Sequence, residues 1–133
     1  DRIKGNECYS KGNYELAIKH YAKVLALNSN DHVCFSNRAM AYIKLNRFQK
    51  AEDDCNSALQ LSPTHVKSIQ RRAKCRLSLG KLRAALIDIS EAKKLEPFSK
   101  EIEKDYCKVK DELTLTMKSC PKTKVDIEWN LSE

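Results

Sequence analysis

Apolar residues recur at helical spacing along most of the chain, and their pattern of small and large side chains repeats at a fixed period. In residues 36–63, small Ala39 and large Tyr42 precede a turn, and large Phe48 and small Ala51 follow it. The equivalent positions one period earlier are Gly5, Cys8, Tyr14 and Ala17, and those one period later are Ala73, Arg76, Leu82 and Ala85. This period, about 34 residues, is the sequence signature of stacked helix–turn–helix units.

This pattern predicts two helices in each of three repeats and one helix after the last repeat. The helices are expected at about residues 2–10, 14–27, 32–44, 48–61, 66–78, 82–95 and 100–117. Gly12 and Gly80 mark turns inside the first and third repeats, and Pro63 and Pro97 end the second and third. We therefore expect an all-α fold, an α-solenoid of three repeats at about 1–31, 32–65 and 66–99 with a C-terminal capping helix at about 100–117.

The last predicted helix and the segment after it differ from the repeats. An apolar stripe along this helix would cover the open end of the stack, as the terminal element of a repeat array must. Its residues are Ile102, Tyr106, Val109 and Leu113. Residues 118–133 place Val125, Ile127 and Trp129 in strand-like alternation with polar residues. Because the sequence offers no partner strand, we expect a flexible tail or the start of a following region.

The composition agrees with a single helical domain. A length of 133 residues fits one domain, and three glycines and three prolines are few enough to favour helices. The chain begins with Asp and has no signal-peptide pattern, so we expect a fragment of a larger protein. No run of 18 apolar residues could span a membrane. The net charge of +7 would suit nucleic acid or an acidic ligand, or simply a solvated surface.

Cysteine and histidine spacing gives no sign of a metal site or of catalysis. The six cysteines form no C-x-x-C pair and none has a histidine at zinc-site spacing. Cys8, Cys55 and Cys107 fall on helix positions that favour small apolar residues, so we expect reduced structural thiols in a cytoplasmic, or also nuclear, protein. Phosphate-binding loops and nucleophile motifs are absent from the sequence. We therefore expect no enzyme activity, no catalytic residue, no metal ligand and no cofactor.

The candidate binding residues lie on the first helix of each repeat, because those helices line the inner groove of such a solenoid. Helical spacing directs nine of their side chains away from the core. In chain order they are Arg2, Asn6, Tyr9, Asn37, Met40, Lys44, Lys67, Arg71 and Lys74. Lys and Arg bind carboxylates through charge-assisted hydrogen bonds, and an Asn amide donates to the same groups. A groove with such residues suits a peptide whose C-terminal carboxylate adjoins an acidic side chain.

The chain resembles the tetratricopeptide repeat (TPR) family, and more narrowly the carboxylate-clamp TPR domains of co-chaperones. In that family a basic residue and an Asn lie four apart on the first helix, an Asn lies on the third, and a Lys and an Arg lie four apart on the fifth. The matching residues are Arg2, Asn6, Asn37, Lys67 and Arg71, and Arg2 stands where the family usually has Lys. The surrounding sequence segments K-G-N, S-N-R-A and K-x-x-x-R-R also match the pattern of that family. Among such domains the chain is most similar to RNA-polymerase-II-associated assembly scaffolds, the "spaghetti" group.

The resemblance implies a co-chaperone adaptor that holds the C-terminal Glu-Glu-Val-Asp tail of heat shock protein 90 or heat shock protein 70. Tyr9, Met40, Lys44 and Lys74 would be secondary contacts, and an aromatic residue at Tyr9 resembles clamps that prefer heat shock protein 90. The resemblance also implies a monomeric module without membrane contact. Two alternatives stay open, a generic TPR scaffold that binds an internal peptide or a folded protein, and a nucleic-acid binder. The groove lacks the aromatic stacking platforms of single-strand binders, which argues against nucleic acid.

Overall fold

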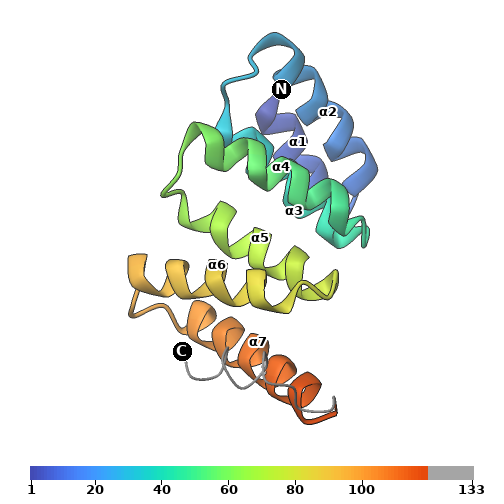
Figure 1. Cartoon of the computed structure of the whole chain (residues 1–133). Coiled ribbons are helices and arrows are strands. Elements are labelled where there is room, and N and C mark those ends of the chain that lie inside the picture. The colour runs from blue at the N-terminus through green and yellow to red at the C-terminus, as the bar shows by residue number, and fades with distance from the viewer. Residues whose placement is uncertain (120–133) are drawn as a thin grey trace.

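The computed structural model describes residues 1–119, which form seven α-helices stacked pair upon pair into an elongated array (Figure 1). The helices are α1 (Arg2–Ser10), α2 (Tyr14–Leu27), α3 (His32–Lys44), α4 (Phe48–Leu61), α5 (Val66–Ser78), α6 (Leu82–Leu95) and α7 (Lys100–Ser119). The predicted all-α solenoid is confirmed, and α1 to α6 have the predicted bounds. Only α7 differs, because it ends at Ser119 rather than at residue 117. The strand-like segment at Val125, Ile127 and Trp129 lies outside the described residues.

Each helix pair turns at one residue with a left-handed backbone. The φ angle is 84° at Gly12, 59° at Asn46 and 79° at Gly80, and these three residues occupy equivalent positions in the three repeats. Glycine adopts this conformation freely because it has no Cβ, and Asn is among the few other residues that tolerate it. The same backbone device therefore recurs in all three repeats, although only two of them use glycine.

Within each pair, one small residue on the first helix lies against a larger residue on the second. In the first pair Gly5 lies against Tyr21, and a Cβ built on Gly5 would come within 2.5 Å of the Tyr21 ring. The equivalent pairs, each within one buried cluster, are Ala39 with Cys55 and Ala73 with Ile89. Because interiors are close-packed, the largest of the three partners requires the smallest opposing residue. Repeat 1 therefore has glycine where repeats 2 and 3 have alanine.

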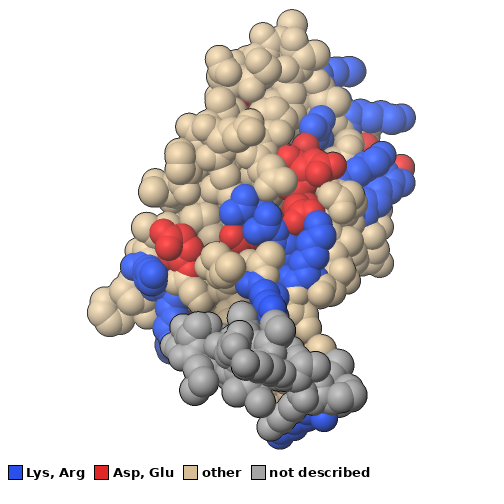
Figure 2. All heavy atoms as spheres, in the orientation of Figure 1, with Lys and Arg blue, Asp and Glu red and all other residues tan. Residues whose placement is uncertain are grey.

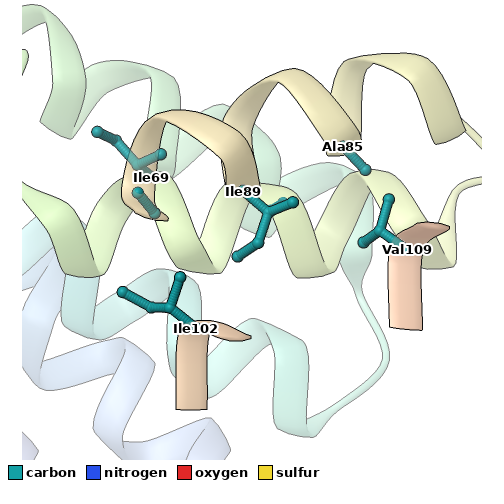
Figure 3. Packing of buried hydrophobic residues seen from close by; sticks show 7 residues of the cluster. Ile69, Ala85, Ile89, Ile102 and Val109 are labelled. Carbon is teal, nitrogen blue, oxygen red and sulfur yellow. The ribbon is translucent and has the colours of Figure 1, made fainter. Parts of the chain in front are cut away.

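The largest buried cluster lies where α7 covers α5 and α6. Ile102 and Val109 of α7 point toward Ile69 of α5 and toward Ala85 and Ile89 of α6 (Figure 3). Ile102 and Val109 retain only 1% and 2% of their exposed surface. Burying aliphatic side chains of this size stabilises a fold by about 1.5–3 kcal/mol each. The apolar stripe predicted for the last helix thus packs on the third helix pair.

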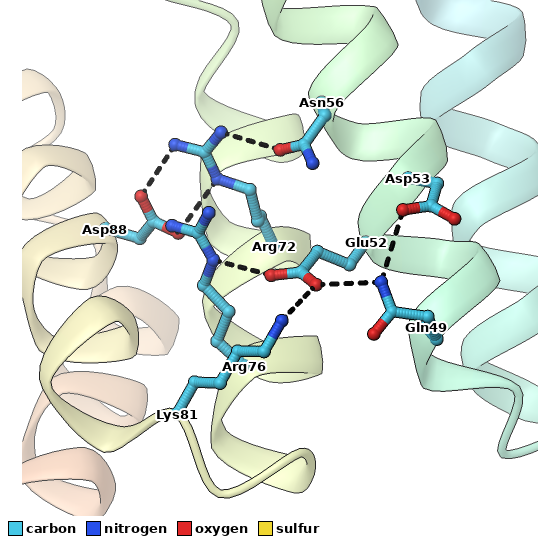
Figure 4. A network of polar contacts seen from close by, with 8 residues as sticks. All are labelled: Gln49, Glu52, Asp53, Asn56, Arg72, Arg76, Lys81 and Asp88. Atoms are coloured by element: carbon cyan, nitrogen blue, oxygen red, sulfur yellow. Dashed lines mark hydrogen bonds and ion pairs between the residues drawn. The ribbon is translucent and has the colours of Figure 1, made fainter.

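A polar network joins α4, α5 and α6 (Figure 4). Asp88 accepts hydrogen bonds from Arg72 Nη2 and Arg76 Nη1, both at 2.8 Å. Glu52 accepts from Arg76 Nε and Lys81 Nζ, also at 2.8 Å. The carboxylate side chains of Glu52 and Asp88 are only 5% and 4% exposed. Since a buried carboxylate is costly without partners, the network holds these three helices in one arrangement.

The cysteines of the described residues are free thiols. Cys55 is buried and Cys8 is half-buried, in agreement with the expectation of apolar structural positions. Cys107 is exposed on α7, so the expectation was wrong there, because the side of α7 that carries Cys107 faces away from the α5 and α6 contact.

Charges of both signs lie close together on the molecular surface. On the face drawn in Figure 2, acidic and basic side chains meet in the middle, beside a broad area without charge. The net charge of +7 therefore does not gather into one basic field on this face. Among the described residues, no helix combines the length and the apolar character needed to cross a membrane.

Candidate functional site

The first helices of the three pairs, α1, α3 and α5, border one pocket. Its lining includes Asn6, Asn37 and Arg71 of the predicted clamp, and Tyr9 and Met40 of the predicted secondary contacts. The structure therefore brings five of the nine candidate residues together, from helices that are far apart in the sequence. The four that lie outside this lining are Arg2, Lys44, Lys67 and Lys74.

A row of hydrogen bonds joins the polar residues of this pocket. The Tyr21 hydroxyl of α2 donates to Asn6 Oδ1 of α1, and Asn37 Nδ2 of α3 donates to the same oxygen at 3.2 Å. From α5, Arg71 Nη1 donates to Asn37 Oδ1 at 3.5 Å and to the carbonyl oxygen and Oγ of Ser36, both at 2.9 Å. We call this row of five residues the polar relay. It links all three repeats across the pocket.

The polar relay leaves N–H donors for a ligand. An Asn amide has two N–H groups and an Arg guanidinium has five. Within the described residues, Asn6 Nδ2 makes no hydrogen bond, Asn37 Nδ2 makes one, and Arg71 makes its bonds through Nη1 alone. Burial lowers the pKa of Arg71, but an arginine stays protonated at neutral pH. The pocket thus combines free N–H donors with a positive charge, which suits a carboxylate.

The other two predicted clamp residues, Arg2 and Lys67, are outside the pocket lining. Arg2 Nη1 donates to both carboxylate oxygens of Asp31, at 3.0 and 3.1 Å. Lys67 is exposed one helical turn before Arg71, and Lys44 is exposed at the end of α3. An exposed ion pair such as that of Arg2 contributes only about 0–1 kcal/mol, so a ligand carboxylate could take the place of Asp31 at little cost.

A second pocket lies further along α3 and α5, toward their C-terminal ends, where α7 forms the other wall. Its lining includes Ile43 of α3 and Lys74 of α5. Lys74 Nζ lies 3.6 Å from Glu101 Oε1 and 4.0 Å from Asp105 Oδ2, both on α7. The charge of Lys74 is therefore already balanced by two acidic side chains of α7.

Tyr21 and Ser36 belong to the polar relay, yet the sequence pattern did not indicate them as site residues. Both are buried, at 1% and 0% exposure, so their helical spacing indicates only a core position. One signal was available in the sequence. Gly5 stands where the other repeats have Ala39 and Ala73, which indicates an unusually large neighbour in repeat 1.

Known proteins share this repeat and this helix arrangement. A family model described as tetratricopeptide repeat matches residues 32–65, and one described as TPR repeat matches residues 5–46. The structure is similar to "First TPR of Spaghetti (RPAP3) bound to HSP90 peptide SRMEEVD", with a TM-score of 0.83 and 34% identity. That match covers 85% of this chain and 90% of the other. The chain belongs to the TPR family.

Other TPR proteins place the chain near the RNA-polymerase-II-associated group, as the sequence resemblance predicted. The second TPR domain of human RPAP3, solved with the HSP70 peptide SGPTIEEVD, has a TM-score of 0.78 and 35% identity. That match covers 81% of this chain and 90% of that domain. Mouse RNA polymerase II-associated protein 3 is 37% identical over 118 residues, which are 89% of this chain and 18% of that protein. The TPR chain thus spans a small part of the curated relatives that it matches.

Proposed function

We propose that this TPR domain is a co-chaperone adaptor module that binds the acidic Glu-Glu-Val-Asp tail of heat shock protein 90 or heat shock protein 70. The observation that carries the proposal is the convergence of Asn6, Asn37 and Arg71 on one pocket with free N–H donors. Two similar TPR domains, at 34% and 35% identity, were solved with peptides that end in EEVD. The same chemistry and the same fold therefore point to the same class of ligand.

In this proposal each clamp residue has a role that suits its position. Asn6 and Asn37 donate hydrogen bonds to the C-terminal carboxylate of the peptide. Arg71 and Lys67 supply positive charge from α5, and Arg2 supplies it from α1 after leaving Asp31. Charge-assisted hydrogen bonds of this kind are about twice as strong as neutral ones, so the carboxylates of the tail provide most of the selectivity.

Upstream residues of the peptide would extend toward the second pocket. Ile43 follows Asn37 by six residues on α3, which is about 9 Å at 1.5 Å per residue. An extended peptide advances about 3.3 Å per residue, so about three residues cover that distance. Lys74 and Lys44 would then approach acidic side chains of the tail. Tyr9 and Met40, which line the first pocket, would contact its apolar side chains.

The proposed module performs no catalysis itself. It would bring a heat-shock chaperone to the rest of a longer protein, as a monomeric domain in the cytoplasm. The proposal of a longer protein is supported by the similarity to mouse RNA polymerase II-associated protein 3, of which the matched region makes up only 18%.

Calorimetric titration with the peptides SRMEEVD and SGPTIEEVD, each as the free acid and with an amidated C-terminus, tests the proposal. We expect micromolar dissociation constants for the free acids, equivalent to about −8 kcal/mol. Amidation should weaken binding at least tenfold, because one carboxylate loses its charge-assisted hydrogen bonds. The affinity should also fall as salt rises, since exposed charges are screened.

Single substitutions separate the clamp from a generic groove. Lys67→Ala removes an exposed clamp charge and should weaken free-acid binding while leaving the fold intact. Lys19→Ala, an equally exposed lysine on α2, is the matched control and should leave the affinity unchanged. Equal binding of the acid and amide peptides would instead indicate a generic TPR scaffold. Absence of peptide binding together with salt-sensitive binding of RNA would indicate the nucleic-acid alternative.

A further inference from the structure

Tyr21 is a core residue that also reaches the candidate site. Its ring is 1% exposed and packs against the backbone of Gly5, where no Cβ stands in the way. This close approach brings the Tyr21 hydroxyl of α2 to Asn6 Oδ1 of α1, to which it donates a hydrogen bond. The hydroxyl thereby belongs to the polar relay, and Tyr21 is one of the residues that line the pocket.

Two donors converge on the Asn6 side-chain oxygen, and this fixes the direction of the amide. The Tyr21 hydroxyl and Asn37 Nδ2 both donate to Asn6 Oδ1. If the Asn6 amide were reversed, its NH₂ group would meet the Asn37 NH₂ group donor to donor. The observed direction leaves Asn6 Nδ2 as a free donor beside the pocket.

We propose that Tyr21 is a positioning residue of the clamp, which orients the Asn6 amide so that its N–H groups meet a ligand carboxylate. This inference rests on the proposed function and concerns the same site. With the amide held in this direction, Asn6 presents its N–H groups to the ligand terminus and keeps its oxygen for Tyr21 and Asn37, which suits an ionised carboxylate. Tyr21 would therefore contribute to the discrimination between a free and a blocked peptide terminus.

The surroundings of the Tyr21 side chain keep its hydroxyl protonated, so that it can donate a hydrogen bond. Burial, and next to it the neighbouring Cys34 thiol, raises the pKa of Tyr21 to about 12. The hydroxyl therefore retains its proton throughout the neutral pH range. Because the ring is held between the helices, the hydroxyl stays beside Asn6 when no ligand is present. The Asn6 amide is thus oriented before any peptide arrives, which reduces the entropy cost of binding.

Only repeat 1 has this device. The positions equivalent to Tyr21 are Cys55 and Ile89, and neither side chain carries a hydroxyl. The same repeat has glycine rather than alanine against the ring. In repeat 3, Ala73 and Ile89 fill the equivalent space without a hydroxyl. Core packing alone therefore does not require a tyrosine at position 21.

Tyr21→Phe tests the inference, because it keeps the ring and removes only the hydroxyl. We expect the variant to keep its thermal unfolding midpoint within a few degrees and to bind the free-acid peptide about fivefold more weakly, the equivalent of one neutral hydrogen bond. The ratio of the affinity for the free-acid peptide to the affinity for the amidated peptide should fall by the same factor. Tyr106→Phe, on α7 and outside the polar relay, is the matched control and should change neither quantity.

A double-mutant cycle with Asn6→Ala distinguishes positioning from a general structural effect. If Tyr21 acts through Asn6, Tyr21→Phe should cause no further loss in the Asn6→Ala background. An equal fivefold loss in both backgrounds, or no loss in the wild-type background, would overturn the inference. If the unaltered chain fails to bind the free-acid peptide, the proposed function fails instead, so the two failures are distinguishable.

Discussion

Gly5→Ala is expected to destabilise the fold, because the added methyl group would collide with the Tyr21 ring. The new Cβ would lie 2.5, 2.8 and 3.0 Å from Cε1, Cδ1 and Cζ of that ring. Favourable carbon contacts begin at about 3.5 Å, and the ring is almost fully buried, so it must shift from its packed position to admit the methyl group. Overpacking of this kind costs about 1–3 kcal/mol, and three short contacts argue for the upper end. The better helix preference of Ala returns about 1 kcal/mol, so the net cost is about 2 kcal/mol.

Thermal unfolding measures this cost directly. Unfolding entropy of about 2.1 cal/mol/K per residue gives about 0.25 kcal/mol/K for the 119 described residues. A net cost of about 2 kcal/mol should therefore lower the midpoint by about 8 °C. The displaced ring would also carry its hydroxyl away from Asn6, so the folded variant should bind the free-acid peptide more weakly.

The double variant Gly5→Ala with Tyr21→Ile tests whether size complementarity is the cause. It gives repeat 1 the same pair that repeat 3 has in Ala73 and Ile89. Most of the lost midpoint should return, whereas the peptide affinity should stay low because the hydroxyl is absent. An unchanged or higher midpoint for Gly5→Ala alone would refute the steric argument. Recovery of full affinity by the double variant would refute the role of the hydroxyl.

Two further predictions concern carboxylates. Asp88→Asn removes the anion that Arg72 and Arg76 share, although Arg76 keeps Glu52, and should lower the free energy of unfolding in urea by about 3 kcal/mol. Asp54→Asn, with one arginine partner, should cost less, and equal costs would contradict the reasoning. Asp31→Asn keeps a good helix N-cap but frees Arg2, so calorimetry should detect about two- to fivefold tighter free-acid binding, equivalent to about 0.5–1 kcal/mol. Exposed Asp111→Asn should leave the affinity unchanged, and unchanged affinity in Asp31→Asn would mean that this carboxylate does not compete with the peptide.

The fold could be predicted from the sequence because the same structural signals occur in each of the three repeats. Helix spacing, turn residues and the repeat period agree with one another in every repeat, so six helix bounds could be predicted. The end of α7 has no such support, since it lies outside the repeats, and the helix continues past residue 117 to Ser119, two positions before Pro121 in the sequence. Asn46 had no glycine to mark it, and its backbone angle became visible only in the structure.

The candidate site could be predicted as a set of positions but not as a set of contacts. Periodicity indicates which helix face a residue occupies, and this was enough to bring Asn6, Asn37 and Arg71 to one pocket. The partner of each side chain depends on small differences in the distances between helices. For this reason the bond from Tyr21 to Asn6 and the pairing of Arg2 with Asp31 could not be read from the pattern.

The three repeats share one geometry but hold their helix pairs together by different chemistry. In repeats 2 and 3 a bidentate Arg–Asp pair joins the two helices, and repeat 1 has Lys4 and His20 at the equivalent positions. Repeat 1 instead relies on the Gly5–Tyr21 contact and on the hydroxyl that reaches Asn6. Substitutions in the ion pairs should therefore change stability with little effect on the pocket. In repeat 1 the same residue serves the core and the candidate site, so stability and binding are coupled there, and separating them requires a change that keeps the packing but removes the hydroxyl, such as Tyr21→Phe.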